Sequence, residues 1–203
     1  LVFAVACAHA SDLAFAEDNG GITLPPGFRA VVAADNLGET RHLELTANGD
    51  LYVTMRRRVD GKSVAALRDA DGDGVMERVE YFGELDGRGT GLGLHGDSLY
   101  VATNSTVYRF PLEEGTLLPV GEPEVIVTGF PRQRSHADKN FAFDESGHIF
   151  VNVGAPSNAC QDPQRRKGQP GLDPCTQLER HAGIWRFDAD EPGQTQLGDG
   201  HRF

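Results

Sequence analysis

The sequence predicts an all-β fold assembled from repeated β-hairpins. Its 203 residues include 25 Gly and 11 Pro, a content that favours short strands joined by turns over long helices. Three apolar triplets begin at Leu51, Leu99 and Ile149, and each directly follows a turn rich in Gly and polar residues. A second apolar stretch precedes each turn, at residues 43–45, 92–94 and 141–143. The repeated unit is therefore strand, tight turn, strand.

Each hairpin is expected to continue into a larger unit. Further strands are predicted at residues 63–67, 106–110 and 183–187. A repeat of about 40 to 50 residues with several strands per unit is typical of the blade of a β-propeller. Propellers have about four or more blades, so the three to four blades present here leave the ring incomplete. We therefore expect residues 22–203 to form the N-terminal half of a larger β-propeller domain.

Composition and the first residues narrow the class of protein. The net charge of −11 argues against nucleic-acid binding, and no apolar run is long enough to span a membrane. Residues 1–16 resemble the remnant of an export signal, with small-residue cleavage options; the alternative is a first strand of the mature domain. Cys7 lies in a weak lipoprotein-like sequence, which leaves a lipid anchor as an option. Export predicts a periplasmic or secreted protein.

The third unit contains a long insertion, residues 152–182, between its second and third strands. It holds Cys160 and Cys175, which could pair in an oxidising compartment. Such a bridge would close a loop of about 15 residues and contribute about 3 kcal/mol; the alternative is two unlinked thiols. Residues 132–167 carry a net charge of +2 while the rest of the chain carries −13. This positive segment either meets an anionic ligand or is an ordinary solvated loop.

His136 is the leading candidate for a catalytic residue. It comes just before the innermost strand of its unit, a position that faces the mouth of a propeller's central channel. A histidine there can act as a general base because its pKa lies near working pH. The alternative is a hydrogen-bonded structural histidine. His181, at the end of the insertion, is a weaker candidate.

Several motifs resemble the glucose/sorbosone dehydrogenase family. They are SHADKNFAFDESGHIFVNVG at residues 135–154, PSNAC at 156–160, DPC at 173–175 and AGIWRFD at 182–188. The resemblance implies an exported six-bladed propeller that uses pyrroloquinoline quinone (PQQ) and calcium to oxidise a sugar or aldehyde. It also implies an external electron acceptor. The family's catalytic arginine, most of its cofactor contacts and its quinone-calcium ligands are expected in later blades, so we expect this chain alone to be inactive.

The resemblance also assigns roles to individual residues. His136 falls on the family's catalytic base, which takes the hydroxyl proton while hydride passes to the quinone. Arg88 stands where the glucose-oxidising branch has a glutamine that contacts the quinone, and a guanidinium could bind a quinone carboxylate there. Asn158 lies at the expected rim of the pocket. Ser135 replaces an aspartate beside the base, so both Arg88 and Ser135 depart from that branch.

Two other functions remain open from the sequence. The first is a calcium-dependent propeller hydrolase of the lactonase kind, in which a channel metal activates water. The second is a propeller that binds a partner without catalysis, because a fold does not decide a function. The hydrolase requires acidic and Asn ligands at the channel mouth, where the third unit offers mainly His136 and basic residues.

A separate motif has the spacing of a twelve-residue calcium loop. Asp69, Asp71, Asp73, Glu77 and Glu80 occupy its oxygen positions around a glycine at position six. Its flanks, residues 64–67 and 75–82, are expected to be strands rather than helices. An extended chain after residue 74 would carry Glu80 roughly 20 Å away. We therefore expect a partial, structural calcium site at Asp69, Asp71 and Asp73, or an acidic turn without metal.

Overall fold

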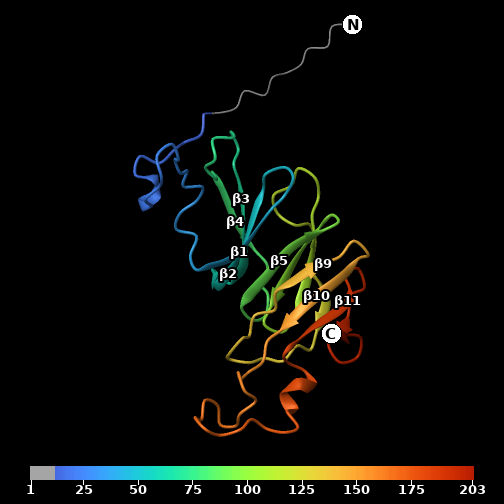
Figure 1. Cartoon of the computed structure of the whole chain (residues 1–203). Helices are drawn as coiled ribbons and strands as arrows, with labels where there is room; N and C mark the ends of the chain where they lie inside the picture. The colour runs from blue at the N-terminus through green and yellow to red at the C-terminus, as the bar shows by residue number, and fades with distance from the viewer. Residues whose placement is uncertain (1–11) are drawn as a thin grey trace.

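The computed structural model describes residues 12–203, which form three sheets in chain order, all antiparallel except for one short parallel pair in the second (Figure 1). The expected export signal at residues 1–16 and the lipid-anchor option at Cys7 fall largely outside the described residues. Within them, Phe15 pairs with Val31 in an isolated bridge. No helix in the described part of the chain is long and apolar enough to cross a membrane.

The first and third sheets each contain four strands. The first consists of β1 (Thr40–Leu45), β2 (Leu51–Val59), β3 (Lys62–Arg68) and β4 (Arg78–Phe82). The third consists of β9 (Phe141–Phe143), β10 (His148–Val153), β11 (Gly183–Asp188) and β13 (His201–Arg202). The predicted strands at residues 63–67 and 183–187 are confirmed. The strand predicted from residue 75 was wrong at its start, because β4 begins only at Arg78.

The second sheet contains five strands. Its own four are β5 (Gly89–His95), β6 (Ser98–Thr103), β7 (Val107–Pro111) and β8 (Glu124–Thr128). The fifth, β12 (Gln194–Thr195), comes from the chain after β11 and pairs parallel with β8. Through this pairing, the chain segment after β11 contacts β8 at the outer edge of the second sheet. Two short 3-10 helices, η1 (Asn19–Gly21) and η2 (Thr176–Glu179), complete the elements.

The innermost hairpins follow the repeat that the sequence predicts. Gly49, Gly96 and Gly147 each occupy a turn with positive φ, which glycine adopts without steric cost. The turns join β1 to β2, β5 to β6 and β9 to β10, all antiparallel. β5 contacts both β1 and β9, and these three strands follow one another across the molecule (Figure 1). The sheets are thus arranged as consecutive blades of a β-propeller, three of them in the described residues.

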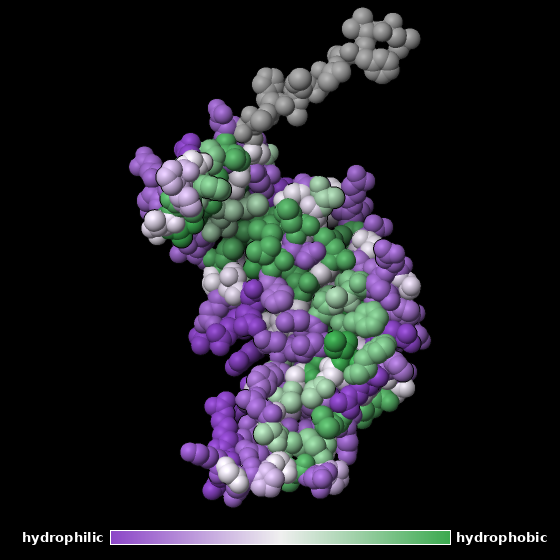
Figure 2. All heavy atoms as spheres, in the orientation of Figure 1, coloured by the Kyte–Doolittle hydropathy of each residue, from purple (hydrophilic) through white to green (hydrophobic). Residues whose placement is uncertain are grey.

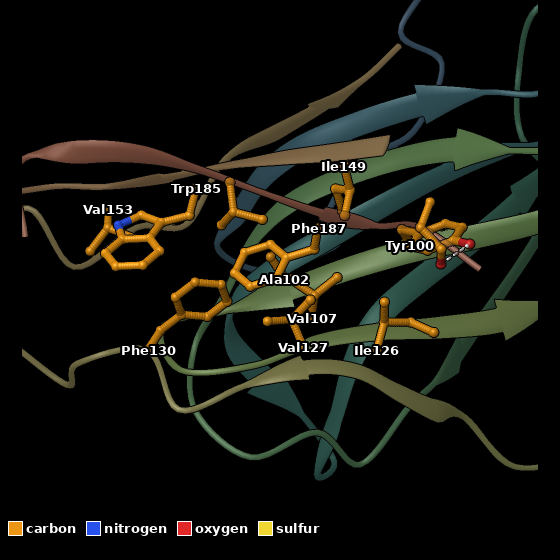
Figure 3. Close-up of a cluster of buried hydrophobic side chains, with 12 residues drawn as sticks. Tyr100, Ala102, Val107, Ile126, Val127, Phe130, Ile149, Val153, Trp185 and Phe187 are labelled. Atoms are coloured by element: carbon orange, nitrogen blue, oxygen red, sulfur yellow. Dashed lines mark hydrogen bonds between the residues drawn. The ribbon is translucent and has the colours of Figure 1, made fainter. Parts of the chain in front are cut away.

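Apolar side chains fill the spaces between consecutive blades. Along β10 burial alternates, so that Ile149, Val151 and Val153 face the second sheet. They meet Trp185 and Phe187 of β11 and the side chains of β6, β7 and β8 (Figure 3). A second cluster joins the first and second sheets through residues that include Tyr52, Val64, Phe82, Leu99 and Phe110. Each such side chain, when fully buried, contributes about 2 kcal/mol, so packing between blades holds the repeats in place.

Some apolar side chains stay at the surface of the outer sheets. Leu43 and Leu45 of β1 expose 66% and 59%, and Ile184 of β11 exposes 49%. Figure 2 shows apolar patches on the face turned to the viewer. These exposed apolar side chains belong to the first and the third sheet.

Candidate functional site

A cavity of about 290 Å³ lies where the inner strands of the three blades begin. It is lined by Arg41, Arg56, Arg88, Gly89, Asn104, Arg134, His136, Ala137 and Asp138. Arg41 belongs to β1, Arg88 directly precedes β5, and residues 136–138 precede β9. Because these inner strands lie side by side, residues nearly 50 positions apart share one cavity. His136 and Arg88, both singled out in the sequence, therefore meet there.

Hydrogen bonding fixes the orientation of the His136 ring. Its Nδ1 lies 2.6 Å from the carbonyl oxygen of Ala155. A carbonyl can only accept, so Nδ1 carries the hydrogen of the neutral ring. Nε2 is then the nitrogen with the free lone pair, the atom that can take a proton from a substrate.

The backbone around His136 is unusual and tightly supported. His136 has φ +51°, a region that costs a non-glycine residue about 1 to 2 kcal/mol. Nε2 of Gln133 lies 2.8, 2.9 and 2.9 Å from the carbonyl oxygens of Ser135, His136 and Gly154, which share its two N–H donors. A Cβ on Gly154 would lie only 2.6 Å from the Cβ and the carbonyl oxygen of His136. Because Gly154 has no Cβ, the His136 loop can pack closely against the end of β10.

The cavity lining is strongly cationic. Arg41 pairs with Asp138, which links the first blade to the third, and Arg56 lies 3.9 Å from Glu39. Arg88 and Arg134 form no ion pair with any residue between 12 and 203. Two guanidinium groups are therefore available for an anionic ligand, and planar guanidinium suits carboxylates best.

Asn104 adds a buried polar atom to the lining. It lies in the turn between β6 and β7, and its Oδ1 is buried without a hydrogen-bond partner in the described chain. An unpaired buried acceptor costs about 1 to 3 kcal/mol.

Sequence reasoning missed part of this lining. Arg41 and Arg88 stand 47 positions apart, and Arg88 and His136 stand 48 apart, so the approximate period of the repeat would have pointed to the region of Arg41. Asn104 carries no comparable signal. Asn158 is exposed and outside the cavity lining. His181 is also outside it, with Nδ1 3.1 Å from the Gln177 carbonyl and a pKa lowered mainly by burial.

The insertion after β10 is a stapled loop. Cys160 and Cys175 form a disulfide with a Cα–Cα distance of 6.0 Å, which confirms the predicted pair. Within the loop, Ser157 is buried and donates to Gln177 Oε1 at 2.8 Å. The loop projects from the end of the third blade, where Figure 1 shows it in orange.

Removal of this staple is expected to destabilise the protein. Because the bridge closes a loop with a sequence separation of 15, the Cys160→Ser, Cys175→Ser double variant should lose about 3 kcal/mol of unfolding free energy. Urea unfolding measures this loss. Reductant should lower the stability of the wild type but not that of the variant. A loss below about 1 kcal/mol would show that the loop is held by other contacts.

The acidic loop between β3 and β4 gathers four carboxylates. Asp69, Asp71, Asp73 and Glu77 can each offer one oxygen within 4.8 Å of the others. Hydrogen bonds from backbone N–H groups, that of Gly74 foremost, lower the pKa of Asp69. Glu77 joins because the chain turns before β4 starts, and its Oε2 accepts from Ala70 N at 2.7 Å. Glu80 lies within β4 and bonds Arg78, outside the cluster, as its spacing predicts.

Comparison with known proteins identifies the family. The TrAA12-like family model matches residues 22–171. Among solved structures, the holo form of the pyranose dehydrogenase PQQ domain from Coprinopsis cinerea matches with a TM-score of 0.69 at 18% identity. That match covers 97% of this chain and 44% of that one. The search of curated proteins found no match.

Two further structures agree. The calcium structure of the family AA12 carbohydrate-active enzyme from Trichoderma reesei has a TM-score of 0.61 at 17% identity, over 83% of this chain and 43% of that one. The PQQ-bound aldose sugar dehydrogenase from Streptomyces coelicolor has a TM-score of 0.50 at 18% identity, over 78% and 47%. This chain thus spans less than half the length of the structures it matches, and shares their fold over that length. The match of the family model over most of its residues shows that the chain belongs to the TrAA12-like family.

Proposed function

We propose that this chain is part of a PQQ-dependent oxidoreductase that acts on a sugar or related aldehyde, with its reaction site at the cavity around His136. The observation that carries the proposal is that one cavity brings together His136, whose Nε2 has no partner among residues 12–203, and two arginines without an ion pair in that range. The fold is shared by the holo form of a pyranose dehydrogenase PQQ domain and by the PQQ-bound form of an aldose sugar dehydrogenase, which supports this choice of cofactor.

The residues of the cavity fit a carboxylate-bearing quinone. Arg88 and Arg134, which both line the cavity, would bind PQQ carboxylates. When bound, PQQ supplies the acceptor for two electrons and a proton. Asn158, which the resemblance places near the cofactor, would contribute from the rim of the pocket.

His136 would provide the base. Oxidation of an alcohol carbon removes the hydroxyl proton together with a hydride, so a base next to the hydroxyl is needed. The Nδ1–H bond to Ala155 leaves Nε2 as the acceptor of that proton. The cationic lining would also stabilise the alkoxide as it forms.

The lining favours this reaction over the metal-dependent hydrolase. Among the described residues, Asp138 is the one carboxylate that lines the cavity, and it pairs with Arg41. A hydrolytic metal would need several oxygen ligands there. The arrangement instead suits an anionic cofactor.

Dye-linked oxidation tests the proposal. The complete protein, reconstituted with PQQ and calcium, should reduce an electron-accepting dye in the presence of aldoses. Activity that appears with lactones and without PQQ would support the hydrolase. Tight ligand binding with neither reaction would support the non-catalytic propeller.

We further propose that Asp69, Asp71, Asp73 and Glu77 hold a structural calcium ion. With Ca–O distances of about 2.3 to 2.6 Å, two ligand oxygens on one ion lie up to about 5 Å apart, which matches the spacing of this cluster. Millimolar calcium should slow amide hydrogen exchange over residues 69–80. Asp69→Asn should abolish this protection, whereas Glu80→Gln, outside the cluster, should keep it. Equal exchange with and without calcium in the wild type would reject the site.

We propose an exported location as well. The Cys160–Cys175 bridge requires an oxidising compartment, and residues 1–16 resemble an export signal. The electrons would then leave to an external acceptor.

A further inference from the structure

A fully buried lysine lies beside the loop that carries His136. Lys139 has 0% exposure, and its Nζ donates to the carbonyl of Ala137 at 2.6 Å. No ion pair among residues 12–203 includes it. Burial lowers the pKa of Lys139 to about 8, against an opposing effect of the Asp138 charge. A buried ammonium without a partner carboxylate is costly, so packing alone does not account for it.

The backbone of Lys139 is anchored on the second blade. Its N–H donates to Oγ1 of the buried Thr90 at 3.1 Å. Its carbonyl oxygen approaches β5 so closely that a Cβ on Gly91 would lie 2.7 Å away. Thr90 and Gly91 follow Arg88 and Gly89 of the cavity wall. Residue 139 is thus a fixed point next to the cavity.

From this fixed point the side chain reaches back two residues. Ala137 lies between His136 and Asp138, and all three line the cavity. Gln133 holds the carbonyls of residues 135 and 136, so the Nζ bond to residue 137 completes the support of the loop. Together these bonds hold His136 in its left-handed conformation, with the ring against Ala155.

We propose that Lys139 is a positioning residue, whose buried ammonium holds the His136 loop against the cavity through the Ala137 carbonyl. The expected loss of kcat without Lys139 rests on the proposed function. The expected loosening of the His136 loop does not depend on it. The ammonium acts on the backbone and does not touch the substrate.

Lys139→Met tests the proposal, because Met has a similar length but no donor. Amide hydrogen exchange over residues 135–138 should become about tenfold faster or more. The thermal midpoint should stay the same or rise, since replacing a buried charge by an apolar side chain is often neutral or stabilising. In the complete protein with PQQ, kcat should fall about tenfold or more while KM for the sugar stays within about twofold.

The matched control is Lys62→Met, which removes a lysine that pairs with Glu84 on the surface of β3. It should leave exchange at residues 135–138 and kcat unchanged. If Lys139→Met behaves like this control, the ammonium is dispensable and the positioning role is overturned. If Lys139→Met fails to fold, the ammonium is a general structural requirement, and the positioning role is overturned as well. If the wild type binds no PQQ, the proposed function fails, and the exchange measurement still decides the role of Lys139.

Discussion

His136→Asn should reduce kcat for sugar oxidation about 1,000-fold, within the range that a general base contributes. The Asn side-chain amide can keep the donation to the Ala155 carbonyl that Nδ1 makes at 2.6 Å. It has no basic nitrogen at the place of Nε2. The loop conformation should therefore survive while proton abstraction is lost. Steady-state kinetics of the reconstituted complete protein measure the effect, and PQQ affinity should stay within about threefold.

His148→Asn is the matched control for this variant. His148 is in the hairpin between β9 and β10, where its Nδ1 lies 2.9 Å from Asp144, away from the cavity. Its replacement should leave kcat within about twofold. If His136→Asn also kept a third or more of the wild-type kcat, another group would be the base.

Gly154→Ala should both destabilise the protein and displace the loop that carries His136. The added Cβ would lie 2.6 Å from the Cβ and the carbonyl oxygen of His136, so backbone on one side must move. Overpacking of this kind costs about 1 to 3 kcal/mol. A shift of about 1 Å in His136 should lower kcat about 100-fold. Urea unfolding and kinetics on the same preparation measure both effects.

Gly49→Ala separates stability from positioning. Gly49 has φ +92° in the first hairpin with open space around it, so alanine there introduces backbone strain but no clash. It should cost about 1 to 2 kcal/mol and leave kcat unchanged. An equal loss of activity in both variants would mean that reduced stability, rather than the position of His136, explains Gly154→Ala.

The fold was largely predictable because the sequence patterns that specify each hairpin lie close together along the chain. Apolar triplets and glycine turns recur along the chain, and each hairpin forms from residues that are close in sequence. The cystine was predictable for the same reason, since 15 residues separate its cysteines. The start of β4 could not be predicted from the sequence. Glu77 accepts a hydrogen bond from Ala70 N within the acidic loop, so the strand begins only after Glu77.

The lining of the candidate site was only partly predictable because residues of three blades form it. The Arg41–Asp138 pair joins residues 97 positions apart and depends on how neighbouring blades pack. The unpaired Oδ1 of Asn104 is a property of three-dimensional burial that no residue pattern reports. His136 and Arg88 could be selected from the sequence, because His136 lies in the family motif and Arg88 lies at the start of a repeat.

A structure of the complete protein with PQQ bound is the most direct test of the central claim. We expect the cofactor in the cavity at the start of the inner strands, with a carboxylate about 2.7 to 2.9 Å from a guanidinium nitrogen of Arg88 or Arg134 and the quinone ring facing His136 Nε2. PQQ bound away from this cavity, or with His136 turned away from it, would contradict the assignment of the site.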